Sequence, residues 1–298
     1  LQNQRTRRWN QGVSRMSSVL ITGAGRGIGR ATSLRLAKAG WEVHAGVRKP
    51  EDGASLVEEL GEGAAGSIVP VTIDVTDDAS IAAAAETLPA QLDGVVNNAG
   101  IVIDGPVESL TRERLAEQYD VNVFGAVAVT RAVLPKIRAA KGRVVFISSV
   151  SGRISTPWTG AYNSSKFAVE GMADALRMEL RPWKIKVSLI EPANTQTDMW
   201  GGAQEMFDES VKALTPDEHA LYKGHMKGMR RTLGLMQKTA SPVDGVAGTI
   251  ESALTSKRPR ARYVVGIPAK VQVISSGITP RPLLDFVLAK ATGVPRKA

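Results

Sequence analysis

The stretch Thr22-Gly23-Ala24-Gly25-Arg26-Gly27-Ile28-Gly29 joins an apolar run, Ser18–Thr22, to the start of a helical pattern. The glycines at 23, 27 and 29 have no Cβ, so the backbone can turn tightly and approach a bound pyrophosphate closely. The first turn of the following helix offers free N–H groups and a positive dipole to such an anion. Glycines in strand–helix turns often serve geometry alone, but a cluster after the first strand of an α/β chain favours a nucleotide site.

Outward from this turn, short apolar runs alternate with helical patterns. Several runs are almost continuously apolar, as strands buried on both faces of a parallel sheet are. The predicted strands are Ser18–Thr22, Glu42–Val47, Ser67–Ile73, Gly94–Asn97, Gly142–Ile147, Ile185–Ile190 and Arg262–Val265. The predicted helices are Ile28–Ala39, Ser80–Thr87, Thr111–Ala140, Tyr162–Arg181 and Val243–Ser256. This alternation predicts the α/β class: a doubly wound Rossmann fold, built as a single domain over residues 16–298 with about seven parallel strands.

Two segments extend the predicted domain. Residues 198–240 are expected to form a helical substrate lid, and residues 267–298 a C-terminal extension of short helices. The apolar side chains of the lid include Met199, Trp200, Met206, Phe207, Met226, Met229 and Met236. They suit a lipophilic substrate, because small-molecule pockets are lined mostly by hydrophobic side chains. The alternative is that they only pack the lid onto the body.

The composition excludes several kinds of chemistry. The chain has no Cys, which excludes disulfide scaffolds, thiolate nucleophiles and iron–sulfur clusters. Its three His residues lie too far apart for a helical metal motif, so we predict no metal site. No apolar run is long enough to suggest a transmembrane span.

The net charge of +9 is concentrated at the two ends of the chain. Residues 1–16 carry four Arg and no acid, and residues 257–298 carry nine Lys or Arg and one acid. No aromatic residues interleave these cations in a recognisable RNA-binding motif, so we expect solvated tails and no nucleic-acid partner. Peripheral contact of the basic C-terminal tail with a membrane is compatible with this pattern.

The first fifteen residues show no apolar periodicity and no apolar signal region. We expect a disordered leader or an extension added for expression, with an Arg-rich mitochondrial transit peptide as the alternative. A cytoplasmic location is the corresponding expectation.

The residues at the end of the second predicted strand indicate whether NAD or NADP is bound. An acid at its carboxyl end would hydrogen-bond the 2′-hydroxyl of NAD, whereas basic residues accommodate the 2′-phosphate of NADP. The strand is followed by Arg48 and Lys49, and Arg26 lies in the glycine turn. Pairing of Arg26 and Arg48 with a phosphate favours NADP(H) over NAD(H). The alternative is that these are exposed loop cations and that NAD(H) is used.

Tyr162 and Lys166 are four residues apart in a predicted helix and therefore share one face. A cation beside a phenol favours the phenolate, so Lys166 is expected to lower the pKa of Tyr162. Such a tyrosine can exchange a proton with an alcohol or carbonyl oxygen while a hydride moves at carbon. Ser149, at the end of a predicted strand, could hold that oxygen.

These motifs resemble, in order along residues 17–200, those of the short-chain dehydrogenases/reductases. The resemblance implies a catalytic tetrad of Asn122, Ser149, Tyr162 and Lys166. In it, Tyr162 is the acid/base, Lys166 lowers its pKa and binds the nicotinamide ribose, Ser149 orients the substrate and Asn122 positions a relay water. The cofactor-binding residues expected from the glycine turn, from the second strand and from this resemblance are Gly23, Arg26, Gly27, Ile28, Gly29, Arg48, Asp74, Val75, Asn98, Gly100, Tyr162, Lys166, Pro192, Thr195 and Thr197. Ala193 stands where the family usually has glycine.

The resulting expectation is an NADP(H)-dependent oxidoreductase that interconverts an alcohol and a ketone or aldehyde. Ile190-Glu191-Pro192 and the long segments after it are similar to the retinol, hydroxysteroid and 3-hydroxybutyrate dehydrogenase branch. The alternatives are an NAD-dependent dehydrogenase of retinoid, steroid or hydroxy-acid type, and a non-catalytic NADP-binding redox sensor. The helices at 111–140 and 162–181 resemble those that form family dimers and tetramers, so a homodimer or homotetramer is expected.

Overall fold

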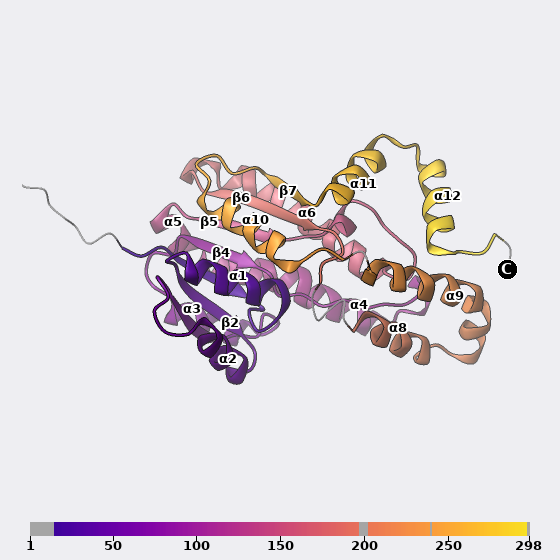
Figure 1. The fold of residues 1–298 in the computed structure, drawn as a ribbon, viewed down its shortest axis with the longest axis horizontal. Coiled ribbons are helices and arrows are strands. Elements are labelled where there is room, and N and C mark those ends of the chain that lie inside the picture. The colour runs from indigo at the N-terminus through magenta and orange to yellow at the C-terminus, as the bar shows by residue number, and fades with distance from the viewer. Residues whose placement is uncertain (1–14, 197–201, 239, 297–298) are drawn as a thin grey trace, which may run out of the picture.

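A seven-stranded parallel sheet forms the centre of the molecule (Figure 1). The computed structural model describes residues 15–196, 202–238 and 240–296. The strands are β1 Ser18–Thr22, β2 Glu42–Val47, β3 Ser67–Thr72, β4 Gly94–Asn97, β5 Arg143–Ile147, β6 Lys186–Pro192 and β7 Arg262–Val265. Their order is β3-β2-β1-β4-β5-β6-β7, so the winding direction reverses between β1 and β4. The predicted single-domain Rossmann fold is confirmed.

Helices cover both faces of the sheet. On one face lie α1 Gly27–Lys38, α2 Pro50–Leu60 and α10 Val243–Thr255. On the other lie α3 Asp78–Thr87, α5 Ala126–Ala140 and α6 Gly160–Glu179. Val19 and Ile21 belong to the first core and Leu20 to the second, because successive strand residues point to opposite faces. Burial on both faces explains why this strand is a continuous apolar run.

The predicted helix Thr111–Ala140 is divided in the structure. It consists of α4 Arg112–Tyr119, a π-helical turn Asp120–Gly125, and α5. A Cβ on Gly125 would lie 2.6 Å from the carbonyl oxygen of Val75, so the turn passes too close to the backbone of the neighbouring segment for any side chain there. A helical periodicity cannot report such a local change of hydrogen-bond pattern.

α2 is not among the helices predicted from the sequence. Pro50 occupies the first turn of this helix, followed by two acids, Glu51 and Asp52. Proline at the first helical position and acids in the first turn are both typical helix-start signals. The signal was therefore present in the sequence.

Residues 202–296 contribute α10 and β7 to the layers of the sheet and form four further helices. Their helices, besides α10, are α8 Ala203–Lys212, α9 Pro216–Lys238, α11 Ile267–Ile278 and α12 Arg281–Thr292. Phe207, Met226 and Met229 form a small core with Trp158 of the body, so part of the apolar content joins α8 and α9 to the body. Met199 and Trp200 lie outside the described residues, as does the side chain of Met236.

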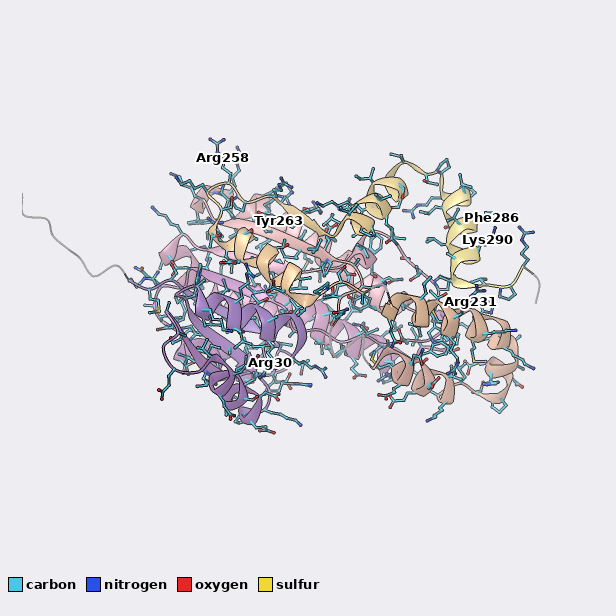
Figure 2. The ribbon with its side chains drawn as sticks, in the orientation of Figure 1. Arg30, Arg231, Arg258, Tyr263, Phe286 and Lys290 are labelled. Atoms are coloured by element: carbon cyan, nitrogen blue, oxygen red, sulfur yellow. The ribbon has the colours of Figure 1, made fainter. Side chains whose placement is uncertain are left out.

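α12 lies far from the sheet, and Figure 2 shows Phe286 and Lys290 on it. Within the described ranges, no helix is both long and apolar enough to cross a membrane. At the other end of the chain, residues 1–14 lie outside the described part, and Arg15 donates two 2.8 Å hydrogen bonds to the carboxylate of Asp93.

A group of buried and partly buried charges joins β7 to α6 and β6. Arg262 of β7 lies 2.9 Å from Glu170, 2.6 Å from Asp174 and 3.3 Å from Glu191. The Glu191 side chain is fully buried, and burial together with the nearby Glu170 raises its pKa to about 7, against the opposing charges of Arg153 and Arg262. Arg262 is therefore the cation that two buried carboxylates share.

We expect Arg262→Met to lower the free energy of unfolding by about 3 kcal/mol near neutral pH, because it leaves the buried Glu170 without its ion-pair partner. The matched control is Arg114→Met, which breaks an exposed pair with Glu117 and is expected to cost less than about 1 kcal/mol. Urea unfolding of the three proteins measures both values. Equal losses for the two variants would contradict this role of Arg262.

Candidate active site

A cavity of about 750 Å³ opens at the carboxyl ends of the strands. It runs from the glycine turn and the end of β2, past the ends of β4 and β5, to residues of α8 and α9. Ligands of doubly wound sheets bind at this edge, where the winding reverses. The predicted site residues that line it are Gly23, Arg26, Gly27, Ile28, Arg48, Asp74, Val75, Asn98, Gly100, Ser149, Tyr162, Lys166, Pro192 and Thr195. Gly29 and Asn122 lie behind its wall, and Thr197 lies outside the described residues.

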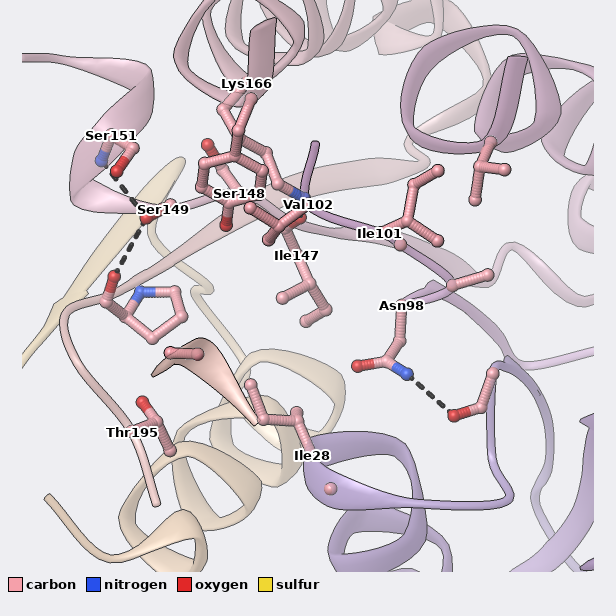
Figure 3. A pocket seen from close by; sticks show the side chains of 18 of the residues that line it. Ile28, Asn98, Ile101, Val102, Ile147, Ser148, Ser149, Ser151, Lys166 and Thr195 are labelled. Atoms are coloured by element: carbon pink, nitrogen blue, oxygen red, sulfur yellow. Dashed lines mark hydrogen bonds between the residues drawn. The ribbon is translucent and has the colours of Figure 1, made fainter. Parts of the chain in front are cut away.

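The glycine turn is attached to β4 by Asn98 (Figure 3). Its side-chain amide donates to the carbonyl oxygens of Thr22 at 2.9 Å and Gly23 at 3.1 Å. In return, the Thr22 hydroxyl accepts from the backbone N–H of Asn98 at 3.0 Å and of Ala99 at 3.1 Å. These bonds hold the ends of β1 and β4 together at the reversal point of the sheet.

Each predicted glycine of this turn has a geometric reason. Gly23 and Gly27 have φ values of +64° and +54°, in the left-handed region that favours glycine. A Cβ on Gly29 would lie 2.3 Å from the Gly23 carbonyl oxygen, so Gly29 allows the turn to pack on itself.

The first turn of α1 faces the cavity with its backbone N–H groups. Its N-cap residue, Arg26, makes no side-chain cap hydrogen bond, and no acid occupies the first turn. Arg26, Gly27 and Ile28 all line the cavity. The helix dipole and these donors fit the pyrophosphate of a dinucleotide.

The end of the cavity beyond the turn carries charges of both signs. Arg26, Arg48 and Lys49 line it, and so do Asp52 and Asp74. Hydrogen bonds from the Thr76 N–H and hydroxyl lower the pKa of Asp74, and the charge of Arg48 adds to this. Asp52 was missed with α2, although an acid four residues after Arg48 was visible in the sequence.

Ser149, Tyr162 and Lys166 meet in the middle of the cavity. Ser149 follows β5 and caps a short 3₁₀ turn, Val150–Gly152, where its hydroxyl accepts from the Ser151 N–H at 3.1 Å. Lys166 is buried and lies with its Nζ 5.6 Å from the centroid of the Tyr162 ring. That ammonium donates to the carbonyl oxygen of Ile147 at 2.8 Å.

Burial controls the proton affinities of this group. It raises the pKa of Tyr162 to about 12, and a side-chain hydrogen bond with Ser149 opposes the rise. Burial also lowers the pKa of Lys166 to about 8, against the opposing charge of Glu170. Lys166 is not among the causes of the Tyr162 shift, so the expectation that Lys166 lowers the pKa of Tyr162 stays a prediction.

Asn122 occupies the π-helical turn and is almost fully buried. Its side-chain oxygen accepts from the Ile101 N–H at 2.9 Å, and its amide donates to the Ile101 carbonyl and the Ser165 hydroxyl, both at 3.1 Å. Asn122 thus joins the segment after β4 to α6, one layer behind the cavity wall.

Residues 192–195 close the cavity beside Ser149. The Ser149 hydroxyl lies 3.4 Å from the Pro192 carbonyl oxygen, and the Thr195 hydroxyl donates to the carbonyl oxygen of Ala193 at 3.0 Å. Ala193 itself lines the cavity.

The remaining wall is mainly apolar but contains an unpaired acid. Its apolar residues include Ile101, Val102, Val121, Val150, Ile154, Met206, Met229 and Leu233. Asp104 lies among the lining residues, and its buried Oδ1 has no hydrogen-bond partner in the described part of the chain. Burial raises the pKa of Asp104 to about 6. The sequence reading passed over this residue, an acid in an otherwise apolar loop.

A glycine turn at the end of β1 and a Ser–Tyr–Lys group in one shared cavity are typical of a nicotinamide-dependent oxidoreductase of the Rossmann type. Within the ranges that the structure describes, no group of three metal-ligating side chains occurs. A family model described as "short chain dehydrogenase" matches residues 17–207. The chain belongs to the short-chain dehydrogenase/reductase family, whose members are oxidoreductases that act on CH–OH groups with NAD or NADP.

Relatives resemble this chain over nearly its whole length. An Escherichia coli (strain K12) protein named "Uncharacterized oxidoreductase YbbO" is 36% identical over 277 residues, covering 91% of this chain and 93% of the relative. "NADPH-dependent 3-dehydrocapnine reductase" of Ornithobacterium rhinotracheale is 33% identical over 285 residues, or 92% and 97% of the two chains. The crystal structure of a short-chain dehydrogenase from Streptomyces avermitilis superposes with a TM-score of 0.75 at 25% identity, covering 95% of this chain and all of that one.

The burial of Asp104 predicts a pH effect on stability. Because its pKa is higher in the folded than in the unfolded protein, the unfolded state releases its proton first as the pH rises. The contribution of Asp104 to the free energy of unfolding therefore decreases as the pH rises from about 4 to about 6, and it is constant above about pH 6. Asp104→Asn removes it, so the variant should gain stability relative to the parent across this range. Urea unfolding at several pH values measures the difference, and a difference independent of pH would contradict the assignment.

Proposed function

We propose that this enzyme is an NADP(H)-dependent oxidoreductase that interconverts a lipophilic alcohol and its ketone or aldehyde, with Tyr162 as the acid/base. The observation that carries the proposal is the presence of Ser149, Tyr162 and Lys166 in the same cavity as the glycine turn. The nicotinamide, when bound, supplies or accepts the hydride. The residues of this chain orient the substrate and handle the proton.

The local geometry supports one role for each side chain. The Ser149 hydroxyl can hold the substrate oxygen, and the hydrogen bond between Ser149 and Tyr162 brings the phenol to the same point. A pKa of about 12 keeps Tyr162 protonated at neutral pH, so it can donate its proton to the oxygen as a carbonyl is reduced. Lys166, beside the ring, stabilises the phenolate that results. The two hydroxyl donors stabilise the developing oxyanion. That no metal takes part stays a prediction.

Two observations support NADP(H). Arg26, Arg48 and Lys49 lie at one end of the cavity, where a 2′-phosphate would need cations. A relative that shares 33% of its residues is named as NADPH-dependent. Asp52 and Asp74 at the same end are the features that would favour NAD(H) instead.

The other expectations stay predictions. α8 and α9 contribute Met206, Met229 and Leu233 to the cavity, which supports a lid over a lipophilic substrate. Phe124 and Phe167 are exposed on the helices expected to form a homodimer or homotetramer. A cytoplasmic location stays a prediction, as does the alternative of a non-catalytic redox sensor.

We expect Tyr162→Phe to lower turnover by about 10²–10⁴-fold, the usual contribution of a general acid. The dissociation constant of NADPH should change little, since the phenyl ring keeps the shape of the wall. Steady-state rates with lipophilic ketones and aldehydes and a fluorescence titration of NADPH measure the two effects. Tyr263→Phe on β7 is the control, because its hydroxyl accepts from the backbone of Arg260 away from the cavity. Retained activity in Tyr162→Phe would contradict the mechanism.

Cofactor choice is tested by titrating NADPH and NADH into the parent protein and into Arg48→Ala. A charge-assisted hydrogen bond to phosphate contributes about 1.5–3 kcal/mol, so loss of Arg48 should weaken NADPH binding by about tenfold or more. NADH binding should hardly change. Asp52→Asn is the matched control of opposite sign, expected to strengthen NADPH binding. Tighter binding of NADH by the parent would overturn the preference.

A further inference from the structure

The outer face of α11 is strongly apolar and exposed. Ile267, Val271, Ile274 and Ile278 follow helical spacing, and their side chains are 76%, 61%, 65% and 80% exposed. The opposite face turns toward the protein, with Ala269 buried and Val273 half-buried. The larger apolar residues of α11 therefore point away from the rest of the protein.

α12 repeats this arrangement. Leu283, Phe286 and Val287 are exposed, whereas Leu284 and Thr292 on the other side are buried. Exposed residues of this size on two consecutive helices form an apolar surface of the kind that marks an interaction site. We call residues 267–296 the C-terminal arm.

The charge of the arm indicates what covers this surface. Lys270, Arg281, Lys290 and Arg296 stand against one acid, Asp285, in the arm. Figure 2 shows Lys290 and Phe286 together on α12, and the Arg296 guanidinium lies 5.4 Å from the centroid of the Phe286 ring. A second copy of the chain would bring like charges together, whereas an anionic surface would complement them. Helices with large apolar residues and Lys or Arg beside them bind at the interface of anionic bilayers.

We propose that the outer face of the C-terminal arm docks on an anionic lipid bilayer. The apolar side chains of α11 and α12 enter the interfacial region, and the flanking cations lie against lipid phosphates. This attachment is peripheral, since none of the described helices can cross a membrane.

The arm also borders the cavity. Gln272 of α11 and Thr292 of α12 are among its lining residues. α12 packs on α9 so closely that a Cβ on Gly228 would lie 2.5 Å from the carbonyl oxygen of Gly293. Docking would therefore hold the cavity beside the bilayer, where a lipophilic substrate is concentrated; this consequence rests on the proposed function, whereas docking itself does not.

Flotation with vesicles tests docking without substrate or cofactor. The full chain is mixed with vesicles of phosphatidylcholine alone or of phosphatidylcholine with an equal part of phosphatidylglycerol. We expect flotation with the anionic vesicles, weaker flotation at high salt, and little with neutral vesicles. Ile274→Asp and Ile278→Asp should each weaken the partition constant by about tenfold, because each removes a large side chain from the interface.

Val57→Asp is the matched control, since Val57 is 44% exposed on α2, outside the arm and outside the helices expected at the oligomer interface. It should leave flotation unchanged, and circular dichroism shows whether each variant keeps its fold. Absence of flotation of the parent with anionic vesicles would overturn the proposal, and so would equal losses in all three variants. If the arm variants instead changed the sedimentation coefficient while flotation persisted, the surface would be an interface between copies. Loss of oxidoreductase activity alone would leave the result of this test unaffected.

Discussion

The hydrogen bonds between Asn98 and the glycine turn are the constraint on which the site depends. A single side chain ties two carbonyl oxygens of the turn to the end of β4, and the Thr22 hydroxyl returns two bonds. They lie where the winding of the sheet reverses, between the part that carries Arg26 and Arg48 and the part that carries Ser149 and Tyr162. The end of the cavity with Arg26 and Arg48 is thereby joined to the part with Ser149 and Tyr162 through short side chains and the backbone, not through long flexible side chains.

Burial shifts the pKa values in the part of the cavity that carries Ser149 and Tyr162. Tyr162 and Lys166 change their pKa values in opposite directions for one reason, the loss of water around each charged form. Behind them, Glu170 opposes the shift of Lys166 and shares Arg262 with Glu191. α6, which carries Tyr162 and Lys166, is thus tied electrostatically to the last two strands of the sheet.

Much of this was predictable from the sequence because it depends on local pattern. The seven strands appear as apolar runs, and the glycine turn and the Tyr162–Lys166 pair are short motifs whose spacing fits one element each. What could not be predicted depends on contacts between distant segments. The direction of the Tyr162 pKa follows from burial, the π-helical turn around Asn122 from its approach to Val75, and the unpaired Asp104 from the closure of the wall around it.

The contact of Gly228 with Gly293 has a mechanical consequence. Because backbone meets backbone there, no rotamer can change to absorb a displacement of one helix against the other. A movement of α9 at this contact would therefore displace the end of α12. Any movement of α9 that widens the mouth of the cavity would carry the end of α12 with it. The amplitude and rate of opening would then depend on how freely the last thirty or so residues of the chain can move.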